Sequence, residues 1–131
     1  MYYALKLTDD SRTKLLSLVN DNFFIPEGWK LNLDHITLIH ENNVTPEIWN
    51  AVSQVLDNFI CPRCEFSITG YAKNKAVWAF RVDTLTMNHT SHITIATAPG
   101  HNPVESNDIK DEDWTEVWCT EKFVGYLVCN P

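Results

Sequence analysis

The sequence has no long hydrophobic run, and its 131 residues include only 4 glycines and 6 prolines. No segment approaches the roughly 20 apolar residues that a membrane-spanning helix needs, so no membrane partner is expected. Hydrophobic residues make up 44% and charged residues 21%, which excludes a disordered or fibrous protein. The length favours one domain over residues 1–131, because two cores of ordinary size need more chain.

The sequence also lacks a secretion signal, because MYYALKLTDD does not have a basic and then apolar start. We therefore expect the protein in the cytoplasm, where its 4 cysteines would be reduced. Cys61 and Cys64 form a lone CxxC pair, and a zinc site would need a second pair at similar spacing. We predict no metal and no other cofactor, and a cysteine-based zinc module is a weaker alternative.

Basic residues are scarce, with 10 Lys and Arg against 17 Asp and Glu. A protein that grips long duplex nucleic acid neutralises many phosphates, so this balance argues against that class of partner. Seven of the acids lie between Glu105 and Glu121, and the rest of the chain is nearly neutral. A small pocket for a nucleotide or an RNA end therefore remains compatible with the charge. The acidic segment, residues 105–121, is interpreted as a lid, a partner surface or a solubilising loop.

The hydrophobic pattern predicts an α+β fold, with two helices against a strongly curved sheet. Helices are expected to begin after Thr8 and at Thr45-Pro46, where an N-cap residue precedes a proline. The apolar stripe of the second helix predicts that Trp49 and Phe59 lie in the core. Strands are expected over residues 2–7, 30–40, 64–71, 76–85, 92–97 and 123–128.

One short phrase occurs twice, as His35-Ile-Thr37 and as His92-Ile-Thr94. Strand side chains alternate, so each histidine faces the same way as its threonine while the isoleucine points to the other face. If the two strands are neighbours, two imidazoles and two hydroxyls share one open face. The remaining histidines repeat neither phrase and are expected in loops or on the surface: His40, His89 and His101.

These residue types match the demands of phosphodiester cleavage. One group must take a proton from the attacking oxygen, another must give a proton to the departing oxygen, and donors must hold the non-bridging oxygens. Imidazole suits both proton roles because its ordinary pKa of about 6.5 lies near working pH. The threonine hydroxyls would donate to the phosphate. Which histidine is the base and which is the acid stays open.

The two phrases resemble the motifs of the 2H phosphoesterases, a superfamily named for two such histidine motifs and built as a bilobal α+β fold without a metal. Residues 35–40, 92–98 and 103–108 are similar to stretches of the cyclic phosphodiesterase domain of fungal tRNA ligases. The resemblance implies that the histidines of the two phrases form the general acid/base pair and that their threonines hold the phosphate. It adds Ser106 and Asn107 as candidates for substrate binding.

The resemblance implies a metal-independent hydrolase whose substrate is a 2′,3′-cyclic phosphate on an RNA end or a nucleotide. Small free-standing members of the superfamily also occur in viruses, where some cleave cyclic or 2′-5′-linked nucleotide signals used in host defence. A viral enzyme that degrades a cyclic dinucleotide or 2′-5′ oligoadenylate in the host cytoplasm is therefore an alternative, as is a module that sequesters a nucleotide without turnover. A base needs an aromatic platform, for which we expect Tyr3, Tyr71 or Trp78.

Overall fold

The computed structural model describes residues 1–58 and 63–130. Phe59 and Cys61, for which the sequence predicts a core position and a lone CxxC pair, lie outside them. The helices are α1 (Asp9–Asn22) and α2 (Pro46–Asp57), with short 3-10 helices η1 (Glu41–Asn43), η2 (Pro103–Asp108) and η3 (Asp111–Asp113). The strands are β1 (Tyr2–Leu7), β2 (Lys30–Leu31), β3 (His35–His40), β4 (Arg63–Phe66), β5 (Ile68–Lys73), β6 (Val77–Val82), β7 (His92–Thr97), β8 (Thr115–Glu116) and β9 (Phe123–Asn130).

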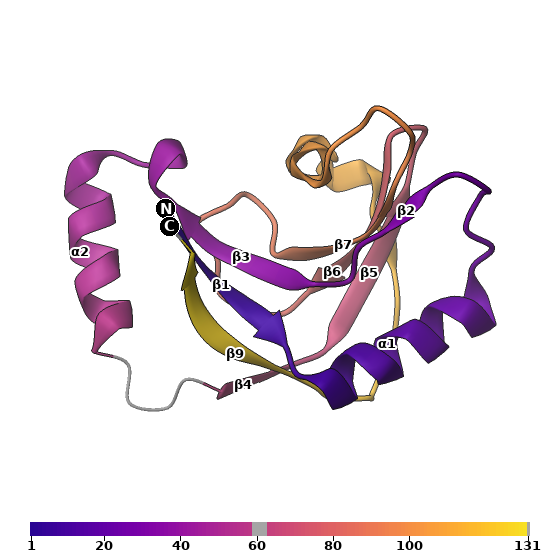
Figure 1. Cartoon of the computed structure of the whole chain (residues 1–131), viewed down its shortest axis with the longest axis horizontal. Helices are drawn as coiled ribbons and strands as arrows, with labels where there is room; N and C mark the ends of the chain where they lie inside the picture. The colour runs from indigo at the N-terminus through magenta and orange to yellow at the C-terminus, as the bar shows by residue number, and fades with distance from the viewer. Residues whose placement is uncertain (59–62, 131) are drawn as a thin grey trace.

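The strands of the described residues form one antiparallel sheet in the order β4-β9-β1-β3-β7-β6-β5-β8, with β2 added beside β7. Figure 1 shows that this sheet is strongly curved and that the two ends of the chain lie together, where β1 and β9 pair. The predicted α+β class is therefore confirmed. A bilobal organisation and a single domain over residues 1–131 stay predictions. No helix in the described ranges is long and apolar enough to cross a membrane.

Helix α1 covers one face of the sheet and closes the main core. The Thr8 hydroxyl caps it by accepting from the Ser11 N–H at 3.3 Å, as its N-cap position predicts. Leu15 and Val19 are buried one turn apart on the inward side of the helix. They pack in a cluster with residues from seven strands, including Ile36 of β3, and with Leu33 of the turn before β3. The apolar side of α1 thus covers the core.

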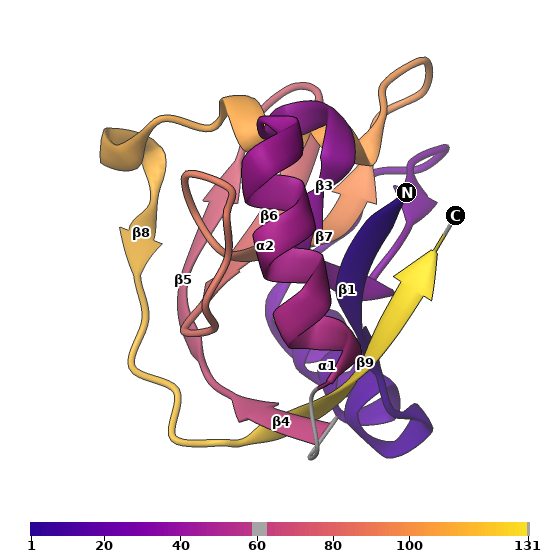
Figure 2. The same cartoon turned by 90° about the vertical axis from the view of Figure 1, so that its left-hand side faces the viewer.

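Helix α2 lies apart from α1, on the other side of the molecule (Figures 1 and 2). Its N-cap is as predicted, because the Thr45 hydroxyl accepts from the Ile48 N–H at 3.3 Å. None of its described residues is buried, so the prediction that Trp49 lies in the core is wrong. An amphipathic stripe specifies a helix with one apolar side, but it does not specify what covers that side.

Tyr3 of β1 fastens α2 to the sheet. Its ring packs on Trp49 with centroids 5.6 Å apart, and its hydroxyl donates to the carboxylate of Asp57 at the end of the helix. The bond to Asp57 and burial raise the pKa of Tyr3 above its ordinary value. A hydroxyl that would be an unpaired polar group on the core side of β1 is therefore satisfied by α2.

Two predicted strands are each divided in the structure. The strand expected over residues 30–40 is interrupted between β2 and β3 by Leu33, which has a φ of 51° and a fully buried side chain. Arg12 of α1 supports this left-handed turn by donating from Nε to the Leu33 carbonyl at 3.2 Å. The strand expected over residues 64–71 breaks at Ser67, so that β4 pairs with β9 while β5 pairs with β6.

Two β-bulges change the alternation of side chains near the centre of the sheet. In the β1–β3 pair, Tyr3 is opposite Ile39 and Ala4 is opposite Thr37, which leaves Leu38 as an extra residue. An extra residue reverses the alternation beyond it. In the β6–β7 pair the extra residue is Ile95, because the partner of Trp78 is residue 96 and the partner of Ala79 is residue 94.

We predict that Tyr3→Phe lowers the free energy of unfolding by about 1 kcal/mol, because it removes one hydrogen bond to a carboxylate and leaves the ring in place. Urea unfolding followed by tryptophan fluorescence measures the change. Tyr126→Phe is the matched control, since no hydrogen-bond partner of its hydroxyl is present in the described residues. Equal urea midpoints for the two variants and the parent would show that the Tyr3 bond does not stabilise the fold.

Candidate active site

The two His-x-Thr phrases lie on neighbouring strands, because β3 and β7 pair antiparallel with Ile36 opposite Ile93. Positions on either side of a matched antiparallel pair are also opposite each other. The His of each strand therefore lies across from the Thr of the other. Both isoleucines are fully buried in the core, so the two imidazoles and two hydroxyls share the opposite face.

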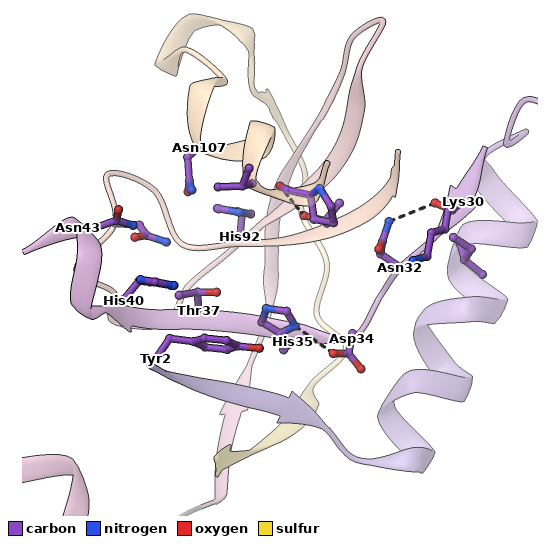
Figure 3. A pocket seen from close by; sticks show the side chains of 15 residues that line it. Tyr2, Lys30, Asn32, Asp34, His35, Thr37, His40, Asn43, His92 and Asn107 are labelled. Carbon is purple, nitrogen blue, oxygen red and sulfur yellow. Dashed lines mark hydrogen bonds and ion pairs between the residues drawn. The ribbon is translucent and has the colours of Figure 1, made fainter. Parts of the chain in front are cut away.

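A cavity of about 530 Å³ opens over this face. All four side chains of the two phrases line it, and so does Asn107 of η2 (Figure 3). In Figure 3, Tyr2 of β1 lies lowest, His35 and Thr37 of β3 lie above it, and His92 of β7 lies higher still. The other lining residues come from β1, from β2 and the turn after it, from the end of β3 and η1, from the loop after β6 and from the start of η2: Tyr2, Lys30, Leu31, Asn32, Asp34, His40, Asn43, Asn88, Pro103 and Val104.

His35 is oriented by a carboxylate. Its Nδ1 lies 3.0 Å from Asp34 Oδ2, and its side chain is one-third exposed (33%). A carboxylate accepts, so the proton is on Nδ1 and Nε2 is the nitrogen left for the cavity. When the ring is protonated, the same contact is an ion pair. The position therefore suits an imidazole that carries a positive charge during part of a reaction.

His92 is oriented by a neutral group. Its Nδ1 lies 3.0 Å from the carbonyl oxygen of Thr90, which accepts the Nδ1 proton and leaves the lone pair on Nε2. Burial lowers the pKa of His92 below its ordinary value, and the nearby charge of His35 lowers it further, although the Thr90 bond acts in the opposite direction. His92 therefore stays neutral, with a basic Nε2, at a pH where an ordinary histidine is partly protonated.

Thr94 is held by Ser106 from the segment that follows β7. The two hydroxyl oxygens are 2.9 Å apart, and both residues are buried. Ser106, which the resemblance offers for substrate binding, is not among the residues that line the cavity. It contacts Thr94 instead and fixes that hydroxyl, whereas Asn107, the next residue, does line the cavity.

The short helix in which the acidic segment begins forms a wall of the cavity. Helix η2 places Pro103, Val104 and Asn107 at its edge, while Ile109 and Trp114 are buried in a small cluster on β5 and β6. A capping box stabilises η2, because a Glu105 carboxylate oxygen accepts the Asn102 N–H at 2.7 Å. Of the three interpretations of this segment, a solubilising loop alone does not describe residues with this packing.

Three aromatic residues expected at the site lie elsewhere. Tyr3 is on the core side of β1, where the apolar Leu5 and Leu7 also point. Tyr71 and Trp78 pack around Phe23 and the Lys73 ammonium group, which lies 4.8 Å from the Trp78 ring centroid. None of the three lines the cavity over β3 and β7.

Among the described residues, two further aromatic side chains line the cavity beside His35 and His92: Tyr2 and His40, both of which the sequence reasoning missed. Their rings stack with centroids 5.7 Å apart and planes 13° apart. Strict alternation assigns His40 to the face opposite His35, but the bulge at Leu38 returns it to the same face. The alternation within β1 could have identified Tyr2, because Tyr3 belongs to the apolar set.

The other two histidines lie at the surface, as expected, and each contacts the acidic segment. His89 Nε2 is 2.8 Å from Asp111 Oδ1, and His101 Nδ1 is 2.9 Å from Glu105 Oε1. The bond to His101 lowers the pKa of Glu105 below its ordinary value. In the described residues, no group of three or more His, Cys, Asp or Glu side chains is placed to hold a metal ion.

Comparison with known protein families identifies the relationship. The model of the fungal tRNA ligase phosphodiesterase domain matches residues 31–127, which include β3, β7 and η2. The chain belongs to this family. It is a 2H phosphoesterase-type domain, and its membership supports a hydrolase with cyclic phosphodiesterase activity. No curated protein and no solved structure matches the chain.

We predict that the His92 imidazole titrates below the ordinary histidine pKa of about 6.5. On acidification the unfolded chain binds this proton first, so the stability contributed by neutral His92 is lost as the pH falls through about 6.5 and the lower pKa of the folded state. Proton NMR of the imidazole resonances measures the titration, and His92→Gln assigns the signal. A midpoint at or above the ordinary value of about 6.5 would contradict the burial argument.

Proposed function

We propose that this domain hydrolyses the 2′,3′-cyclic phosphate of an RNA end or a nucleotide, in the cavity over β3 and β7. One observation carries the proposal: the antiparallel pairing puts two histidines and two threonines on a single cavity wall, with each histidine opposite the threonine of the other strand. The family supports the cyclic phosphodiester as the bond that is cut. His35 and His92 move the protons, and Thr37 and Thr94 hold the phosphate.

His92 is the general base in this proposal. Its Nδ1–H is occupied by the Thr90 carbonyl and its lowered pKa keeps Nε2 unprotonated, so Nε2 takes a proton from the attacking water. The water oxygen forms a bond to phosphorus as one bond from phosphorus to a ribose oxygen breaks. Burial suits His92 to start the reaction as the base, because it disfavours the protonated form and so leaves Nε2 free to accept a proton.

His35 is the general acid. Its Nδ1–H points to Asp34, which stabilises the imidazolium by an ion pair, and Nε2–H gives its proton to the departing ribose oxygen. The product is an open phosphomonoester with a free ribose hydroxyl. The contrast between a carboxylate partner and a carbonyl partner is what separates the roles of two otherwise similar histidines.

The threonines supply neutral donors for the non-bridging oxygens. A hydroxyl rotates to follow the oxygen as negative charge moves during the reaction. Thr94 starts from a fixed position, because Ser106 lies 2.9 Å away and both hydroxyls are buried. Ser106 is therefore a positioning residue for Thr94, and Thr37 faces the same phosphate from the other strand.

We predict that His35→Ala and His92→Ala each lower kcat by about 100-fold or more on the correct substrate, which is the usual contribution of a general acid or base. The assay offers an RNA oligonucleotide with a 2′,3′-cyclic phosphate, several cyclic dinucleotides and a 2′-5′ oligoadenylate, all with EDTA. Product mass identifies the bond that is cut. His89→Ala is the matched control, because its imidazole is exposed and does not line the cavity.

Cleavage of a dinucleotide or oligoadenylate, and not of the RNA end, would favour the alternative of a signal-degrading enzyme. Binding of a nucleotide by folded protein without any turnover would favour a sequestering module. Equal turnover by the parent and both histidine variants would contradict the proposed mechanism altogether.

We also predict that Asp34→Asn lowers kcat by about 10-fold with a smaller change in KM. The variant removes the charge that pairs with protonated His35, while His35 still forms part of the cavity wall. The matched control is Asp21→Asn in α1, an exposed carboxylate outside the cavity. Steady-state kinetics at several pH values measures both constants. A change confined to KM would assign Asp34 to substrate binding instead.

A further inference from the structure

One end of the cavity is walled by side-chain amides. Asn43 ends η1, Asn88 lies in the loop between β6 and β7, and Asn107 lies in η2, yet all three line the same cavity. In Figure 3, Asn43, Asn107 and His40 lie to one side of the two phrase histidines, while Lys30 and Asn32 lie to the other. The three residues Asn43, Asn88 and Asn107 are called the amide end below.

The side chains of the amide end have no hydrogen-bond partner in the part of the chain that the structure describes. Some other asparagine side chains are satisfied within the protein. The amides of Asn22 and Asn58 donate to backbone carbonyls at 2.8 and 2.7 Å, each within a single helix or its cap. Three segments distant in sequence therefore converge on the cavity with free donors and acceptors.

The chemistry of the amide end matches a heterocycle better than a phosphate. Each amide presents one acceptor oxygen and an NH₂ donor, and it carries no charge. The edge of a nucleobase also mixes donors and acceptors, and asparagine pairs with such edges. A phosphate only accepts, and the lysine that lines the cavity, Lys30, lies on the other side of the histidines in Figure 3.

A flat aromatic surface adjoins the amide end. The Tyr2 and His40 rings stack on each other, with planes 13° apart, and both line the cavity. His40 lies on the same side of the phrase histidines as Asn43 and Asn107 (Figure 3). Bases stack on aromatic side chains whatever their sequence, so this surface supplies affinity while amides supply discrimination.

We infer that the amide end is a nucleobase subsite, which takes the base of the nucleotide whose phosphate is cleaved and makes the enzyme selective between bases. The inference rests on the proposed function, because the base and the cyclic phosphate belong to the same ribose. The phosphate lies between the two histidines and the two threonines, and the base lies towards Asn43, Asn88 and Asn107.

The test compares the 2′,3′-cyclic phosphates of adenosine, guanosine, cytidine and uridine with an RNA end whose last nucleotide is abasic. We expect the parent to favour one or two bases by about 5-fold or more in kcat/KM, as for a hydrogen-bonded base edge. Asn43→Ala and Asn88→Ala should each raise KM for the favoured base about 3- to 10-fold and narrow the spread between bases. The loss on the abasic RNA end should be smaller.

Asn50→Ala is the matched control, because Asn50 is exposed on α2 and does not line the cavity. Thermal unfolding shows that each variant is folded. Equal kcat/KM for the four bases, or KM values that neither cavity variant changes, would overturn the base subsite while the proposed hydrolysis stands.

If none of the cyclic phosphates is turned over, the proposed function fails, and the subsite is then tested by binding alone. Calorimetry with the four nucleoside 2′-monophosphates measures Kd for the parent and the same variants. Weaker binding by Asn88→Ala than by Asn50→Ala would support the subsite. Equal Kd values for these two variants would overturn it.

Discussion

The pairing of β3 with β7 is the constraint on which the rest of the structure depends. Ile36 opposite Ile93 joins the half of the sheet that holds β4, β9 and β1 to the half that holds β6, β5 and β8. The same register buries both isoleucines under α1 and turns the two His-x-Thr pairs to the cavity. A slip of one residue would exchange the faces, exposing isoleucine and burying histidine. Core packing therefore selects the register that assembles the site.

Alternation along these strands explains why the site could be predicted and where the prediction failed. Period-two reasoning needs only local sequence, so it placed each histidine on the same face as its own threonine before any neighbouring strand was known. The position of a β-bulge depends instead on the strands and loops that pair with the bulged strand. Leu38 becomes the extra residue of β3 while its carbonyl accepts the Met87 N–H at 2.7 Å, from a loop far along the chain. That contact is invisible in the sequence around His40.

The same distinction separates the helices from what they cover. Capping threonines at residues 8 and 45 are local signals, and both helices begin where those signals predict. Whether the apolar stripe of α2 enters a core depends on the surface that faces it, and there Tyr3 provides one ring contact and one hydrogen bond. Similarly, Leu33 breaks a predicted strand because its side chain enters the core at a left-handed turn that Arg12 supports.

The charge of the protein also constrains how the proposed site holds an anion. Part of the charge of the acidic segment is engaged, because Glu105 and Asp111 contact His101 and His89. With 10 Lys and Arg against 17 Asp and Glu, the chain has few cations for binding an anion, whether a single phosphate or long nucleic acid. Neutral hydroxyls, amides and rings can hold a nucleotide without many cations. A site of this composition fits a substrate with one phosphate at its centre and a recognisable base beside it.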